Sequence, residues 1–124
     1  MKKYDLEDRL VNFSVLSIEI SRSIRSSKEG SYLSDQLMRS GVSPSLNYGE
    51  AISGESKRDF IHKLKIVLKE LRETYNCLRI IQRTCSKGSE TLIEKAIKEN
   101  DELIAIFVKS IKTLKEKMER DVLR

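Results

Sequence analysis

The 124-residue sequence is poor both in helix breakers and in the residues that build catalytic or metal sites. It has one proline, five glycines, no tryptophan, two cysteines and a single histidine. So few helix breakers favour long helices. One histidine and two cysteines without a CxxC pair do not build a typical zinc site. Because a glycine-rich phosphate loop and a nucleophile paired with a base are also missing, we predict no enzymatic activity, no cofactor and no metal.

Long apolar runs are missing as well. No stretch approaches the roughly 20 apolar residues that a membrane-spanning helix needs, so we expect no membrane partner. The start, Met1-Lys2-Lys3, leads into acidic residues rather than into an apolar signal core. Cys77 and Cys85 fall on one expected helix at a spacing of roughly 12 Å, too far for a disulfide. These features predict a cytoplasmic protein with two reduced thiols.

Apolar residues recur at three- and four-residue steps in four segments, and no segment alternates as a strand does. The expected helices cover about 5–27, 32–52, 57–85 and 90–119. Gly30 is expected to close the first helix as a C-terminal cap. Gly41 and Pro44 interrupt the second, which predicts a kink near Gly41–Pro44 or two short helices. Ser56 followed by Asp59 resembles a capping box that opens the third helix.

The short connections after the second and third expected helices favour antiparallel neighbours. The predicted fold is therefore all-α, an antiparallel up-down-up-down four-helix bundle forming a single domain over residues 1–124. Asn100 falls on the apolar face of the last helix. It is either a device that sets helix register, by analogy with coiled coils, or a chance half-exposed amide.

Positive charge is concentrated in the third helix. The chain carries a net charge of +5, and residues 56–87 alone contain nine basic and three acidic residues. Helical spacing places six of these cations on one face, which we call the basic row: Arg58, Lys65, Lys69, Arg72, Arg79 and Arg83. A long row of cations suits a polyanion, because each phosphate contact releases condensed counterions. The alternatives are a solvated helix face or a surface for an acidic protein.

A second set of side chains forms a polar stripe on the second helix. Its members are Gln36, Arg39, Ser40, Ser43, Asn47 and Glu50. Small hydroxyls and amides beside an apolar face serve hydrogen bonding between closely packed helices. We interpret the stripe as intramolecular polar packing or as a subunit interface. A catalytic role is disfavoured, because no histidine lies nearby in sequence to act as a base.

Two segments of the sequence, 36–51 and 59–74, resemble a family signature. The residues that match it are Gln36, Leu37, Arg39, Ser40, Ser43, Asn47, Glu50, Ala51, Asp59, Phe60, Ile61, Glu73 and Thr74. They resemble the bacterial four-helix bundle proteins encoded in 23S rRNA intervening sequences, whose relatives include the accessory protein of diversity-generating retroelements. The chain departs from the pattern at Cys77, where relatives often carry tryptophan, and at Pro44.

The resemblance implies a homo-oligomer, a ring-shaped pentamer, with a role linked to nucleic acid and no established reaction. It leaves two hypotheses. In the first, the oligomer binds RNA or DNA through the basic row. In the second, it is an adaptor that holds a partner such as a reverse transcriptase or another nucleic-acid enzyme.

Overall fold

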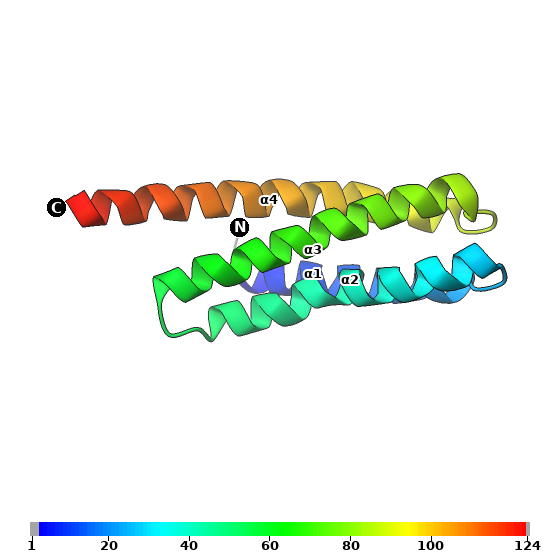
Figure 1. Ribbon diagram of the computed structural model, residues 1–124, viewed down its shortest axis with the longest axis horizontal. Helices are drawn as coiled ribbons and strands as arrows, with labels where there is room; N and C mark the ends of the chain where they lie inside the picture. Colours follow the sequence, from blue (N-terminus) through cyan, green and yellow to red (C-terminus); the bar gives the residue numbers. More distant parts are fainter. Residues whose placement is uncertain (1–2, 124) are drawn as a thin grey trace.

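The computed structural model describes residues 3–123 as a bundle of four helices; residues 1, 2 and 124 of the expected domain lie outside the described part. The helices are α1 (Lys3–Ser23), α2 (Lys28–Ile52), α3 (Lys57–Thr84) and α4 (Glu90–Leu123). Consecutive helices run in opposite directions along the bundle (Figure 1). Each helix packs on the next, and α4 returns to α1 with the sparsest contact. The all-α bundle is therefore confirmed, and no strand occurs in residues 3–123.

The core is one apolar cluster to which all four helices contribute. Its largest fully buried side chains include Phe13 on α1, Leu37 on α2, Leu71 on α3 and Phe107 on α4. The ring of Phe107 packs edge-on against that of Tyr48, with 5.7 Å between the centroids. No helix in the described part of the chain combines the length and apolarity needed to cross a membrane.

Helices α1 and α2 approach each other closely because small residues face one another at their contact. Ser17 is fully buried, and its hydroxyl donates to the carbonyl of Phe13 at 2.9 Å. A Cβ atom added at Gly41 would lie 2.3 Å from the Oγ of Ser17. The hydroxyl of Ser14 also lies 3.3 Å from the carbonyl oxygen of Gly41 on the facing helix. Glycine at position 41 is thus required by the distance between the two backbones.

The boundary between α1 and α2 differs from the one expected. Helix α1 ends at Ser23 and α2 begins at Lys28, so Gly30 lies in the first turn of α2 and its expected role as a C-terminal cap is wrong. Ser27 caps α2 instead, since its hydroxyl accepts from the Gly30 N–H at 3.0 Å. A Cβ at Gly30 would lie 1.8 Å from the carbonyl oxygen of Ile24. Close approach, and not a left-handed backbone, therefore explains this glycine.

Helix α2 passes through Gly41 and Pro44 without interruption. Of the two expected outcomes, one kinked helix or two short helices, the structure has a single helix. Pro44 removes the N–H that would bond to the carbonyl of Ser40, a loss that isolated helices tolerate poorly. Pro44 is buried, and α2 packs along both α1 and α3, so tertiary packing stabilises the helix across the proline.

The contact between α3 and α4 contains a buried amide. Asn100 has no exposed surface. In the amide orientation that satisfies both of its polar atoms, its nitrogen donates to the carbonyl of Leu71 at 3.0 Å and its oxygen accepts from the Tyr75 N–H at 3.2 Å. Asn100 is therefore a buried residue that bonds to the backbone of α3, and the expectation of a half-exposed amide is wrong.

Candidate nucleic-acid interface

The basic row lies on the solvent side of α3. This helix is capped by Ser56, whose hydroxyl accepts from the Asp59 N–H at 3.1 Å as the capping pattern predicts. The apolar face of α3, which includes Leu64, Val67 and Leu78, is buried in the core of the bundle. The helical period then turns the other face outward, and all six cations of the basic row are exposed.

Some of the cations on the other faces of the bundle are neutralised by carboxylates. Arg9 on α1 makes two hydrogen bonds to Glu99 on α4, at 3.0 and 2.6 Å. Lys63 lies 3.2 Å from Glu50. By contrast, none of the six cations of the basic row forms an ion pair with a carboxylate among residues 3–123. The basic row is therefore a surface of uncompensated positive charge.

Two further contacts shape the charge of this face. Lys115 on α4 lies beside Lys65 and lowers the pKa of Lys65, first through the hydrogen-bonding contact between the two side chains and then through the repulsion of their like charges. The guanidinium of Arg79 stacks over the ring of Tyr75, with 5.7 Å between its central carbon and the ring centroid. Lys115 was missed in the sequence, since nothing in the spacing of α3 indicates a cation contributed by α4.

Aromatic side chains contribute little to this face. Tyr48 is buried against Phe107. Tyr32 is 65% exposed, but it lies on α2 and not on α3. Tyr75 is half-buried and covered by Arg79. The face is thus suited to phosphates more than to bases.

The polar stripe of α2 is engaged mostly in contacts within the chain. Arg39 donates to Glu70 at 3.1 Å and also to Glu73, which ties α2 to α3. The amide nitrogen of Asn47 donates to the carbonyl and the hydroxyl of Ser43, at 3.0 and 2.8 Å. These contacts favour the interpretation of the stripe as intramolecular packing.

The other three residues of the polar stripe differ in their exposure and contacts. Ser40 is 1% exposed, Gln36 is half-buried, and Glu50 is exposed and paired with Lys63. Within residues 3–123 the hydroxyl of Ser40 has no hydrogen-bond partner. The stripe's role as a subunit interface stays a prediction.

Within residues 3–123, no cluster of side chains marks a centre for covalent or metal chemistry. Cys77 and Cys85 are both free thiols, and burial raises the pKa of Cys77 to about 11. The Cys77 thiol is therefore protonated and unreactive at neutral pH. The described part of the chain contains no group of three or more histidine, cysteine or carboxylate side chains arranged to hold a metal ion.

Comparison with known proteins agrees with the resemblance seen in the sequence. A crystal structure of a protein of unknown function from the S23 ribosomal protein family of Bacteroides thetaiotaomicron is similar to this chain, with a TM-score of 0.78 and 29% identity. The similarity covers 86% of this chain and 98% of that one. No curated protein matches the sequence. Residues 2–109 match the profile of the 23S rRNA-intervening sequence proteins, and the chain belongs to that family.

Proposed function

We propose that this protein is a non-catalytic, cytoplasmic four-helix bundle that binds RNA or DNA along the basic row of α3. The observation that carries the proposal is that six exposed cations gather on one face of α3, none of them with a carboxylate partner among the described residues. By helix rise alone the row from Arg58 to Arg83 is roughly 37 Å long. A phosphate backbone supplies anions along such a length, and their binding is driven by counterion release.

The same geometry indicates how the nucleic acid is recognised. Contacts from exposed lysine and arginine side chains position a phosphate backbone but read no base edges. Aromatic platforms for bases are poorly developed on this face. We therefore expect affinity with little sequence preference, and a steep dependence on salt.

The test is a charge reversal on the exposed side of α3. The triple variant Lys69→Glu, Arg72→Glu and Arg79→Glu is expected to weaken binding to an RNA hairpin at least about 30-fold at 0.1 M salt. Each lost phosphate contact is also expected to lower the slope of log affinity against log salt by about 0.7 to 0.9. Fluorescence anisotropy over a salt series measures both, with a DNA hairpin of the same sequence to compare the two nucleic acids.

A matched control reverses three exposed lysines on other faces, Lys28, Lys95 and Lys98, and so makes the same change in net charge. This control should keep affinity within about threefold of the original chain, because non-contacting charges act only at long range through screened interactions. Equal loss in both variants, or no loss in the first, would overturn the basic row as the binding surface. Capture of a protein partner that survives nuclease treatment would instead support the adaptor hypothesis.

We also propose that the bundle assembles into a homo-oligomer. Apolar side chains remain exposed on the outer surface of α1 and α2, among them Leu46 at 65%. With Ile18 and Val42, this side chain lines a shallow hollow that also contains Ser43 and Asn47 of the polar stripe. Exposed apolar patches beside polar groups are typical of protein interfaces, and a second copy of the chain is the partner that the oligomer proposal requires.

Light scattering tests the assembly. A pentamer is expected to show about five times the 14.3 kDa mass of the chain. Leu46→Glu should shift the mass toward that of the monomer, because it places a charge in the apolar contact. Val122→Glu, at an exposed position near the end of α4, is the matched control and should leave the mass unchanged. A mass of 14.3 kDa for the original chain would contradict the oligomer.

A further inference from the structure

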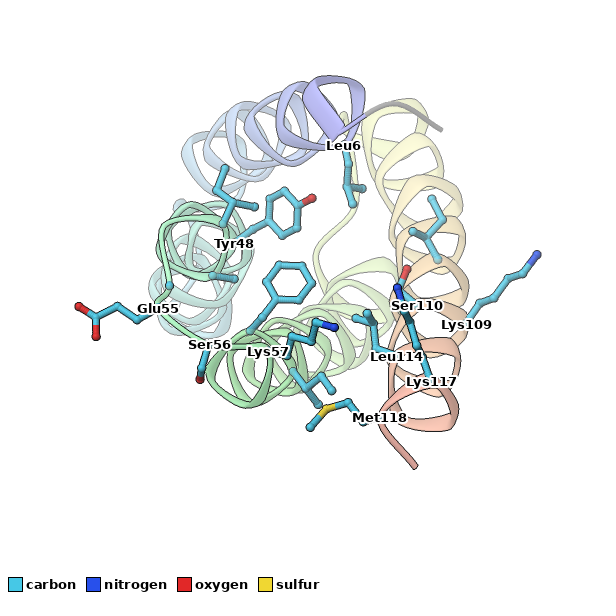
Figure 2. A pocket seen from close by; sticks show the side chains of 16 residues that line it. Leu6, Tyr48, Glu55, Ser56, Lys57, Lys109, Ser110, Leu114, Lys117 and Met118 are labelled. Carbon is cyan, nitrogen blue, oxygen red and sulfur yellow. The ribbon is translucent and has the colours of Figure 1, made fainter. Parts of the chain in front are cut away.

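An apolar cavity of about 730 Å³ opens where α2 ends, α3 begins and α4 passes alongside (Figure 2). Its apolar wall is formed by Leu6, Ile52, Phe60, Ile106, Leu114 and Met118. A neighbouring hollow of about 350 Å³ shares part of this wall and extends toward Phe107 and Leu64 in the core. Binding sites for small molecules in proteins have volumes of about 300 to 1,000 Å³ and mostly apolar linings, so the cavity is large enough for a ligand.

Two ammonium groups face this cavity. Lys57, in the first turn of α3, points toward its centre, and Lys117 extends along α4 toward Ser110 (Figure 2). Two other charged residues of the lining, Lys109 and Glu55, point away from it (Figure 2). Lys57 forms a long ion pair with Asp121, 3.9 Å between Nζ and Oδ2, and Lys117 forms none with a carboxylate among residues 3–123. The charge offered to the cavity is therefore positive.

A neutral hydrogen-bond donor lies deeper. Tyr48 turns its hydroxyl toward Leu6 across the cavity, while its ring is packed on Phe107 (Figure 2). Burial, together with the charge of Glu7, raises the pKa of Tyr48, so the hydroxyl stays protonated at neutral pH. The cavity thus combines apolar walls, one neutral donor and two cations.

We propose that this cavity binds a single-chain amphiphilic anion, with the alkyl chain against the apolar wall and the carboxylate or phosphate head group held by Lys57 and Lys117. A neutral apolar ligand would leave Lys117 without an anionic partner among residues 3–123 and Lys57 with only its long contact to Asp121, and a small anion would leave the apolar wall in water. An amphiphilic anion satisfies both parts of the site.

The site is separate from the features on which the nucleic-acid proposal rests. No residue of the basic row lines the cavity. Four residues of its α4 wall, Ser110, Leu114, Lys117 and Met118, follow the segment 2–109 that matches the family profile. The binding of an amphiphile can therefore hold or fail independently of RNA binding.

Isothermal titration tests the proposal, with decanoate, dodecanoate and dodecyl phosphate below their micelle concentrations and dodecanol below its solubility limit. Affinity is expected to rise roughly fourfold for each methylene that is buried. Dodecanoate or dodecyl phosphate should bind at least about 10-fold more tightly than dodecanol, because charged partners strengthen hydrogen bonds. The two anions together show which head group is preferred. Absence of binding by both anions, or equal binding of dodecanol, would overturn the proposal.

Substitutions then locate the site. Lys57→Gln with Lys117→Gln should weaken the binding of the better anion at least about 10-fold, whereas Lys109→Gln, on the same lining but directed away, should leave it within about twofold. Ser110→Trp fills the cavity from α4 and should abolish binding, with circular dichroism showing that the bundle is intact. Binding that is unchanged in the double lysine variant and in Ser110→Trp would overturn this location.

Discussion

Replacing Asn100 by aspartate is expected to lower the free energy of unfolding by about 3 kcal/mol or more at pH 7. Asn100 has no exposed surface, and its amide nitrogen donates to the carbonyl of Leu71. An aspartate would turn a charged oxygen toward that carbonyl oxygen, placing two acceptors together with no proton between them. Denaturant unfolding followed by circular dichroism, at a fixed protein concentration, measures the loss.

The pH dependence of this variant has a definite sign. Burial raises the pKa of the introduced carboxyl in the folded state above the value of about 3.9 in the unfolded chain. Its deficit in stability is therefore small near pH 4 and below, and grows as the pH rises through the folded-state pKa. A variant as stable as the original chain at pH 7 would contradict the burial of position 100.

Asn100→Leu is the matched control for the charge. Without the asparagine, the carbonyl of Leu71 and the N–H of Tyr75 are one helical turn apart on α3 and can bond to each other. Replacing a buried amide by an apolar group of similar size should then change stability by no more than about 1 kcal/mol. A loss comparable to that of the aspartate variant would show that the amide itself, and not the avoidance of charge, matters at this position.

A second large effect is expected at Gly41. Gly41→Ala should lower the free energy of unfolding by about 1 to 3 kcal/mol, because the new methyl group overpacks the contact between α1 and α2. The added Cβ would lie 2.3 Å from Ser17 Oγ and 2.6 Å from Ser17 Cβ, and Ser17 is fully buried. The two helices must move apart to accommodate it. Thermal or denaturant unfolding measures the change.

Another glycine of the same helix provides the control. At Gly49 no atom lies within 4 Å of the position a Cβ would take. Gly49→Ala should therefore stabilise the protein by about 0.5 to 1 kcal/mol through helix propensity alone. Removing the Ser17 side chain in the Gly41→Ala background should recover part of the loss in a double-mutant cycle. Equal effects at positions 41 and 49 would contradict the close contact of α1 and α2.

The fold could be predicted from the sequence wherever a local signal and the helical period agreed. At the start of α3, Ser56 and Asp59 supply a cap and the apolar residues that follow repeat with the helical period, so the expected and observed helices nearly coincide. The basic row could be predicted for the same reason, because its six members belong to one helix and their direction depends only on residue spacing.

The features that could not be predicted depend on packing between distant segments. The local sequence around Gly30 is the same whether this glycine ends one helix or begins the next. Its place in the first turn of α2 depends on its close approach to the carbonyl of Ile24, which the local sequence does not reveal. Pro44 breaks isolated helices, but here α1 and α3 support α2 on both sides of it. Lys115 and the amphiphile cavity require the relative placement of α3 and α4, about which residue spacing says nothing.

The absence of carboxylate partners along the described basic row has a kinetic consequence. Because the six cations of the row lie along one face of α3 without carboxylate partners, positive potential is concentrated along that long side of the molecule. A polyanion then exerts a torque on the bundle during approach and turns α3 toward itself before any contact forms. The bundle would arrive already oriented, and this advantage in association rate would diminish as ionic strength rises.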